Sequence, residues 1–172
     1  MKYEIIENFL DDDKFKYLTD IINQNTFNWN ISNKPNKNAT KENQIQLVHV
    51  THEYGVAISN FAAVLIPPIM NAFMNHKNYN KLYLTRAKIN CFIKSNEHIP
   101  LGFHKDILDE EDFKTLLLYL DTNNGYTEFE TGEKIPTVKN SALIFDANIS
   151  HQTVTQTDSM FRKNININYK EI

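Results

Sequence analysis

The chain has 172 residues, of which 41% are hydrophobic and 23% are charged, and its formal net charge is −3. These values are typical of one ordinary globular domain with a sizeable core, and the slightly acidic charge argues against non-specific binding to nucleic acid. The single cysteine, Cys91, excludes an intrachain disulfide and favours a reducing, cytoplasmic setting. The longest apolar run, Phe61 to Met70, is too short to span a bilayer, so we expect no membrane anchor.

The first half of the chain shows helical and extended patterns in turn. We predict strands at Tyr3–Phe9 and Gln44–Val50, and helices after Asp11 and over Ser59–Met74. Because Pro67 and Pro68 lack backbone donors, the second helix should be kinked or split. The polar stretch Asn30–Asn43 predicts a long loop, which is either a lid over a site or a disordered segment.

The second half is rich in strand patterns. A long strand is predicted at Leu82–Ile93, followed by a short one over Leu101–Ile107 and a turn at Asp121–Gly125. The remaining predicted strands are Phe113–Leu120, Tyr126–Glu130, Ile135–Val138, Ser141–Asp146, Ser150–Val154 and Phe161–Tyr169. Short strands with frequent turn signals favour a jelly roll, here mainly β and supported by N-terminal helices. Residues 1–80 would supply the helical support and the lid region, and residues 82–170 the jelly-roll core of one domain.

The tripeptide His104-Lys105-Asp106 is the first candidate for a chemical site. In a strand, residues i and i+2 point to the same face, so His104 and Asp106 project together. An imidazole and a carboxylate can form two corners of the two-histidine, one-carboxylate set that holds non-haem Fe(II), and His151 is the candidate third ligand. Taken alone, the tripeptide also fits an ordinary surface strand with a solvated Asp.

Two strands carry polar side chains at alternate positions. The polar members are Arg86, Lys88 and Asn90 in the first strand, and Arg162, Asn164, Asn166 and Asn168 in the second. Each row either faces solvent or lines a polar interior. Arg86 and Arg162 are the two arginines in a chain with 18 basic residues, so each is a candidate for a task that needs a planar fork of donors, although both could be ordinary surface residues.

The ordered set of motifs resembles the Fe(II)- and 2-oxoglutarate-dependent oxygenases, in particular small prolyl-4-hydroxylase-like members that phages often encode. The motifs are His104-x-Asp106, Leu117-Leu118-Tyr119-Leu120-Asp121, Gly125-Tyr126-Thr127-Glu128-Phe129, Ser141-Ala142-Leu143-Ile144-Phe145, His151 and Arg162, together with the opening Tyr3–Leu10 and the strand Arg86–Asn90. The resemblance covers most of the chain outside Asn30–Asn43. It departs from the family in the shortened turn at Gly125–Glu128.

The resemblance implies a role for individual residues. His104, Asp106 and His151 match the iron ligands. Arg162 matches the residue that pairs with the distal carboxylate of 2-oxoglutarate, and Tyr119 matches a tyrosine that helps to hold the same group. Thr115, on the Tyr119 face, and Asn90 are further candidates for the cosubstrate pocket.

Three functions are compatible with this pattern. The first is an Fe(II)-, 2-oxoglutarate- and O2-dependent dioxygenase that hydroxylates a peptide, of prolyl type, or another small substrate, with succinate and CO2 as coproducts. The second is the same chemistry on nucleic acid, which the net charge disfavours. The third is a jelly-roll metal-binding module without enzymatic activity. Because Asp106 is present, halogenation, which needs that position vacated, is disfavoured.

Overall fold

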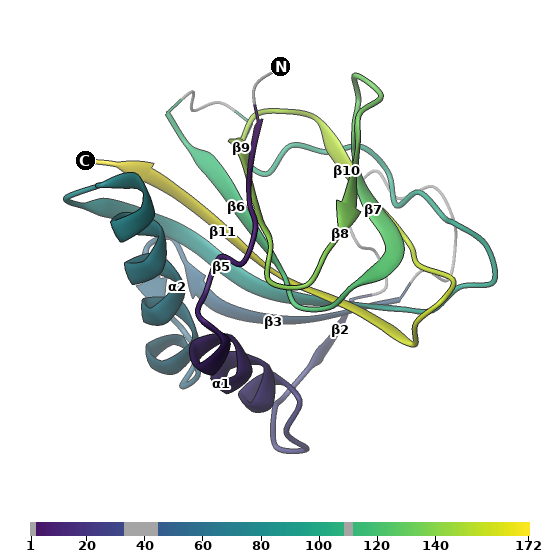
Figure 1. The fold of residues 1–172 in the computed structure, drawn as a ribbon, viewed down its shortest axis with the longest axis horizontal. Coiled ribbons are helices and arrows are strands. Elements are labelled where there is room, and N and C mark those ends of the chain that lie inside the picture. The colour runs from purple at the N-terminus through teal and green to yellow at the C-terminus, as the bar shows by residue number, and fades with distance from the viewer. Residues whose placement is uncertain (1–2, 33–44, 109–111) are drawn as a thin grey trace.

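Two antiparallel β-sheets and two helices make up the computed structural model, which describes residues 3–32, 45–108 and 112–172 (Figure 1). In this part of the chain, eight strands form a large sheet in the order β1-β9-β6-β11-β5-β3-β2, with β4 paired to β3, and three strands form a small sheet in the order β10-β7-β8. The elements are β1 (Tyr3–Ile6), α1 (Asp12–Ile22), β2 (Asn30–Ser32), β3 (Gln46–Glu53), β4 (Val56–Ala57), α2 (Ala62–Lys77), β5 (Leu82–Ile93), β6 (Lys114–Tyr119), β7 (Asn123–Phe129), β8 (Lys134–Thr137), β9 (Ala142–Asp146), β10 (His151–Val154) and β11 (Phe161–Glu171).

The main hydrophobic core lies between the helices and one face of the large sheet. Both helices lie on that face in Figure 1, on the side away from the small sheet. The apolar side chains of α1 and α2 pack there against every second residue of the central strands, such as Ile89 on β5 and Ile165 and Ile167 on β11. The apolar residues at every second position of the strands and those at helical spacing in α1 therefore form one core.

The opposite face of the large sheet is covered in part by the small sheet. A second cluster of buried side chains fills the space between them: Leu117, Tyr119, Phe129, Ile135, Leu143 and Phe145. The space is apolar where β6 and β9 contribute and polar where β5 and β11 contribute, because alternate residues of β11 are buried polar side chains. This layered arrangement of antiparallel sheets is the jelly roll expected from the sequence.

Most predicted elements are confirmed with small changes at their ends. Asp11 caps α1 as expected, since its side chain accepts a hydrogen bond from the Lys14 backbone N–H at 2.9 Å. β5 spans the predicted Leu82–Ile93. The N-terminal part is less helical than expected, because β1 to β4 come from residues 3–57 and all join the large sheet.

Four local predictions are corrected. The helix α2 is not split and runs through Pro67 and Pro68, because its apolar side chains are buried in the core and outweigh the lost backbone hydrogen bonds. The segment 101–107 is not a strand; an isolated bridge from His104 to His151 joins it to β10, and a second bridge, Pro100 to Val154, lies just before it. The predicted turn at 121–125 is shorter, because β7 begins at Asn123, which pairs with Thr137. Finally, residues 30–32 form β2; the rest of the predicted loop up to Asn43 lies outside the described residues.

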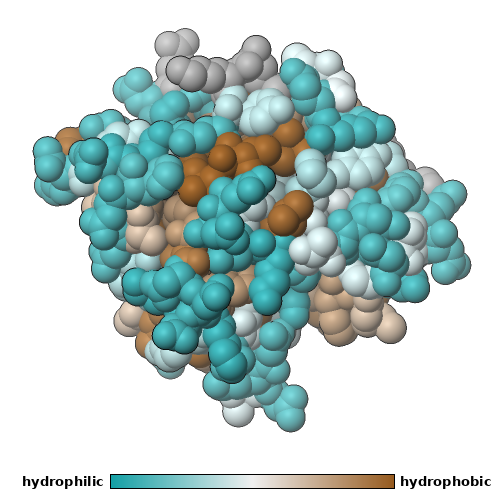
Figure 2. All heavy atoms as spheres, viewed as in Figure 1, coloured by the Kyte–Doolittle hydropathy of each residue, from teal (hydrophilic) through white to brown (hydrophobic). Residues whose placement is uncertain are grey.

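The exterior is mainly hydrophilic on the face drawn in Figure 2, where apolar side chains gather in separate patches. In the ranges that the structure describes, neither helix is long and apolar enough to cross a membrane. Cys91 is a free, buried cysteine on β5.

Candidate metal centre

His104, Asp106 and His151 meet at the edge of the space between the two sheets. His104 and His151 exchange both backbone hydrogen bonds of an isolated bridge, each with an N···O distance of 2.9 Å, which places the two rings side by side with centroids 4.5 Å apart. Asp106 follows two residues after His104, and its backbone N–H donates to Ala147, just before β10. The isolated bridge, and not a regular strand, therefore positions His104 and Asp106 next to His151.

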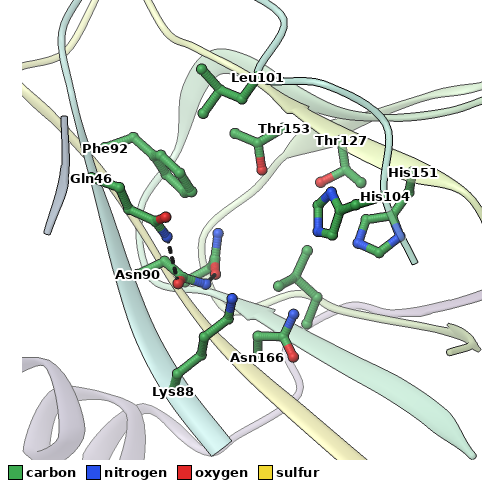
Figure 3. Close-up of a pocket in the computed structure, with 12 residues that line it drawn as sticks. Gln46, Lys88, Asn90, Phe92, Leu101, His104, Thr127, His151, Thr153 and Asn166 are labelled. Atoms are coloured by element: carbon green, nitrogen blue, oxygen red, sulfur yellow. Dashed lines mark hydrogen bonds between the residues drawn. The ribbon is translucent and has the colours of Figure 1, made fainter. Parts of the chain in front are cut away.

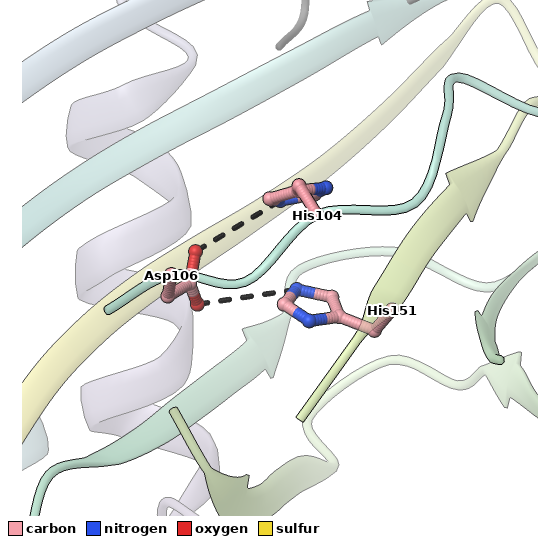
Figure 4. Close-up of side chains that lie close together, drawn as sticks. All are labelled: His104, Asp106 and His151. Carbon is pink, nitrogen blue, oxygen red and sulfur yellow. Dashed lines mark ion pairs between the residues drawn. The ribbon is translucent and has the colours of Figure 1, made fainter. Parts of the chain in front are cut away.

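The three side chains point at one another (Figure 4). The distances are 3.9 Å from His104 Nε2 to Asp106 Oδ1 and 3.9 Å from His151 Nε2 to Asp106 Oδ2. One ligand atom from each residue lies within 4.8 Å of the others. Small side-chain rotations can bring all three onto one ion, and two imidazoles with one carboxylate on one side form a donor set suited to Fe(II) with further positions open.

Backbone carbonyls orient both imidazole rings. His104 Nδ1 lies 3.3 Å from the Gly102 carbonyl, and His151 Nδ1 lies 3.0 Å from the Ile149 carbonyl. A carbonyl only accepts hydrogen bonds, so each Nδ1 carries a proton and each Nε2 is the ring atom that faces Asp106. This is the orientation that a metal-ligating histidine needs.

Asp106 is held by three hydrogen-bond donors on one of its oxygens. The Oδ2 atom accepts from Thr115 Oγ1 at 2.8 Å, Asn166 Nδ2 at 3.1 Å and Asn168 Nδ2 at 3.2 Å. These donors fix the plane of a carboxylate that is only 2% exposed, and they leave Oδ1 as the less occupied oxygen. The side chains of Thr115 and Asn168 are also joined to each other, at 2.9 Å.

The protonation states suit metal binding. Burial, with repulsion from His151, lowers the pKa of His104 to about 4. Burial alone would raise the pKa of Asp106, but electrostatic interactions with His151, Lys88 and His104 and the Thr115 hydrogen bond hold it below its usual range. At neutral pH the carboxyl is therefore ionised and the His104 ring is neutral, which are the forms that bind cations.

Arg162 lies deeper in the same space and has no anionic partner. It is fully buried, and its Nε and Nη2 atoms donate to the hydroxyls of Thr137 at 2.8 Å and Thr127 at 3.3 Å. Its Nη1 atom is buried without any hydrogen bond, and within the described residues Arg162 forms no ion pair. Tyr119 donates its hydroxyl to Thr127 at 2.8 Å, on the same cluster. Burial lowers the pKa of Arg162, as expected for a cation that lacks a counter-charge.

A small polar pocket lies beside the two histidines (Figure 3). It is lined by residues of β3, β5, β6, β7, β10 and β11 and reaches His104, His151 and Thr127, the threonine that holds Arg162. Asn90 forms part of its wall, where it accepts a hydrogen bond from Gln46 at 2.7 Å and donates one to Asn164 at 2.8 Å. The cavity measures ≈ 30 Å³, which is room for about two water molecules. An organic acid would have to displace side chains here.

The structure gathers the residues singled out from the sequence, with one difference in placement. Thr115 contacts the carboxylate of Asp106, whereas Tyr119, on the same face of β6, lies beside Arg162. The polar row of β11 is buried, which confirms the polar-interior alternative. On β5, Asn90 is buried and Lys88 lines the pocket, so plain solvent exposure is wrong for both.

Sequence reasoning missed Thr127, Thr137 and Gln46. The two threonines hold Arg162, and Gln46 holds Asn90. Each lies in a strand that carries other polar residues or a proline, so nothing in the local sequence marks it. Only the pairing of distant strands reveals them, so no local signal could have found them.

Comparison with known proteins gives a structural answer and no sequence-level one. No family model matches the chain, and no curated protein matches it. Among solved structures, a 2OG-Fe(II) oxygenase family oxidoreductase from Burkholderia pseudomallei is similar with a TM-score of 0.69 and 11% identity, over 98% of this chain and 85% of that one. A viral collagen prolyl hydroxylase from Paramecium bursaria Chlorella virus-1, determined with 2OG, gives a TM-score of 0.59 and 18% identity, over 100% and 97%.

A third similar structure is a Trichoplax adhaerens prolyl hydroxylase in complex with a hypoxia-inducible-factor oxygen degradation domain peptide fragment. Its TM-score is 0.66 at 13% identity, over 98% of this chain and 83% of that one. At such identities the likeness concerns the fold, and the site must be judged by its own geometry. The chain has the fold of the 2-oxoglutarate- and Fe(II)-dependent oxygenases and carries an intact His-x-Asp…His triad within it.

Proposed function

We propose that the chain is an Fe(II)- and 2-oxoglutarate-dependent dioxygenase. The observation that carries the proposal is the joint presence of the triad and a buried, unpaired arginine in one interior space. His104, Asp106 and His151 would hold the iron. Arg162 would pair with the distal carboxylate of 2-oxoglutarate through its free Nη1 edge, with Tyr119 beside it.

The residues of the pocket fit this cosubstrate chemically. A buried guanidinium between neutral hydroxyls and aromatic rings is costly unless an anion completes it, and a planar fork is suited to a carboxylate. Arg162 lies four residues from Asn166, or about 13 Å along β11, and Asn166 contacts Asp106. An arginine side chain and a five-carbon diacid can together span such a separation. Asn90 and Asn164 line the path between them.

The bound iron and cosubstrate would supply the oxidising chemistry that converts O2 and 2-oxoglutarate into succinate and CO2 and hydroxylates a C–H bond. The protein's own part is to orient the ligands, through the two carbonyls on the histidines and the three donors on Asp106. It also supplies charge compensation through Arg162 and a small polar pocket beside the metal ligands.

For the substrate we propose a peptide, with a prolyl or similar residue as the target. Support comes from the two similar structures that are prolyl hydroxylases, one of which holds a peptide fragment. The net charge of −3 argues against the alternative of nucleic-acid demethylation.

The test is anaerobic addition of Fe(II) and 2-oxoglutarate followed by O2, with succinate and bound iron both measured. The wild-type protein should bind about one iron per chain and form succinate, and His104→Ala, Asp106→Ala and His151→Ala should lose both while keeping the fold. His76→Ala, on the exposed side of α2, is the matched control and should lose neither. Full iron binding and turnover in a triad variant would refute the assignment.

Substrates are scored in the same assay by mass and by released formaldehyde. Proline-containing peptides should gain 16 Da, the mass of one oxygen atom. Formaldehyde from methylated single-stranded DNA, without any peptide product, would overturn the peptide proposal while leaving the oxygenase chemistry in place.

A further inference from the structure

The inner faces of β5 and β11 form a row of facing side-chain pairs that extends well past the cosubstrate pocket. The pairs, in order from the Arg162 end, are Phe92 with Arg162, Asn90 with Asn164, Lys88 with Asn166 and Arg86 with Asn168. Asp106 is bound by Asn166 and Asn168, so the metal site lies at the level of the last two pairs. Arg86 lies six residues along this row from Arg162, or about 20 Å away.

Arg86 and Lys88 are two cations at the metal end of this row, and the acidic group that acts on Lys88 is Asp106, a proposed metal ligand. Both are half-buried, and the Nε atom of Arg86 is fully buried with no hydrogen bond. Among the residues that the structure describes, neither side chain forms an ion pair. In Figure 3, the Lys88 ammonium group extends into the pocket between Asn90 and Asn166. Neighbouring half-buried cations repel each other and lose hydration, and the carboxylate of Asp106 would be shared with a bound metal, so a further anion would stabilise the pair.

The cosubstrate does not account for Arg86. One end of 2-oxoglutarate is assigned to the metal and the other to Arg162, and Arg86 lies at the opposite end of the row from Arg162, whereas Lys88 lines the pocket at the level of the metal. An anion at Arg86 must therefore belong to another molecule, and the molecule that needs to approach the metal from this side is the substrate.

An aromatic hollow continues the row beyond Arg86. It measures ≈ 540 Å³ and is lined by Tyr54, Tyr83, Thr85, Phe113, Lys170 and Ile172. Tyr83 and Lys170 are a facing pair of the same two strands, two positions past Arg86 and Asn168 across the irregularity at Asn168/Tyr169. Apolar rings exposed beside unpaired cations suit a segment that presents an acidic group next to an apolar or cyclic side chain.

We propose that Arg86 and Lys88 bind a carboxylate of the substrate, and that the substrate is a peptide segment with an acidic side chain close to the residue that is hydroxylated. The inference rests on the proposed function and adds a substrate class to it. A carboxylate fits better than a nucleic-acid backbone, because a backbone needs a row of surface cations, whereas Arg86 and Lys88 are half-buried.

The test compares two blocked, fluorescently labelled hexapeptides that differ in one residue, glutamate or glutamine, next to a proline. Dissociation constants are measured by anisotropy with the protein loaded with Mn(II) and 2-oxoglutarate, and again with metal-free protein. The wild type should bind the glutamate peptide about tenfold more tightly or better, as one charge-assisted contact implies. Arg86→Gln and Lys88→Met should each bring the ratio towards one, and Arg86→Lys should restore part of it.

Lys81→Gln, an exposed lysine just before β5, is the control and should keep the wild-type ratio. An equal affinity of the wild type for both peptides would overturn the inference, and so would a preference that survives in Arg86→Gln and Lys88→Met. A loss of 2-oxoglutarate affinity with no change in the peptide ratio would assign the cations to the cosubstrate. Binding of an oligonucleotide that Arg86→Gln abolishes, without any peptide preference, would replace the carboxylate by a phosphate.

The proposed function can fail separately. If metal-free protein shows the glutamate preference and Arg86→Gln removes it, the anion site stands even when no succinate forms. If succinate forms but the ratio is one, the oxygenase stands and the acidic substrate is rejected.

Discussion

Replacing Arg162 by methionine should separate stability from cosubstrate binding. The side chain is fully buried, makes two hydrogen bonds to neutral hydroxyls and leaves Nη1 unpaired. Removing a buried charge in favour of an apolar group of similar volume is neutral or stabilising by about 1–4 kcal/mol. Against this stands the loss of the two contacts, at about 0.5–1.5 kcal/mol each. The net change in the free energy of unfolding should lie within about 3 kcal/mol of zero, a Tm shift of at most roughly 6–12 °C.

The effect of Arg162→Met on 2-oxoglutarate should be much larger. Truncating one partner of a buried, hydrogen-bonded charge pair costs about 2–5 kcal/mol, which corresponds to roughly a 30- to 5,000-fold rise in Kd. At a concentration 100 times its wild-type Kd, 2-oxoglutarate should stabilise the wild type by about 2.7 kcal/mol and the variant by less than about 1 kcal/mol. Arg162→Lys, which keeps the charge and loses the fork, should fall between them.

The assay is thermal unfolding of Mn(II)-loaded protein, which cannot turn over, with and without 2-oxoglutarate. An Arg162→Met protein that unfolds with several kcal/mol less free energy, yet gains the full wild-type shift from 2-oxoglutarate, would refute the reasoning. Arg162 would then be a structural cation, and the cosubstrate would bind elsewhere.

Three further predictions concern single side chains. Asn168→Ala removes one of the donors that hold Asp106 and should weaken Co(II) binding by about 10- to 100-fold, measured by the visible absorption of the bound ion. Asn96→Ala, on an exposed bend, is the control and should bind Co(II) like the wild type; equal affinities in both variants would deny Asn168 this role. Tyr119→Phe should weaken 2-oxoglutarate binding mildly, by about 0.5–1.5 kcal/mol, or up to about 3 if its hydroxyl serves the charged carboxylate, and calorimetry showing no change would place that hydroxyl outside the site. Burial raises the pKa of Cys91 to about 11, so the thiolate is scarce at pH 8, and a disulfide reagent should label Cys91 only after unfolding; prompt labelling of the native protein would contradict this.

The sequence was sufficient for the parts of the site that follow a strand period. The alternation in Phe161–Tyr169 placed Arg162 and the three asparagines on one face, and that face is the buried polar one. The helix after Asp11 was recognisable from its cap and its apolar spacing. In each case the face that the local sequence pattern predicts to be buried is the face that the tertiary fold buries.

Other features were beyond a single sequence because they depend on partners distant in the chain. The segment with His104 and Asp106 has the alternation of a strand but pairs with β10 only through isolated bridges. Residues 123–125 have the composition of a turn, but Asn123 pairs with Thr137 of β8, so these residues belong to the strand β7. Whether Arg86 and Lys88 faced solvent or the site could not be decided from β5 alone, since the same alternation serves both arrangements.

The central position of β11 has a consequence for how this protein can change. Its odd-numbered residues Ile165, Ile167 and Tyr169 build the core under the helices, and its even-numbered residues line the site, so one strand carries both tasks. Deleting or inserting a single residue would turn isoleucines towards the pocket and asparagines into the core. Insertions and deletions are thus tolerable in the loops but not in β11. Variants that keep the fold while losing the site must arise by substitution at alternate positions of this strand.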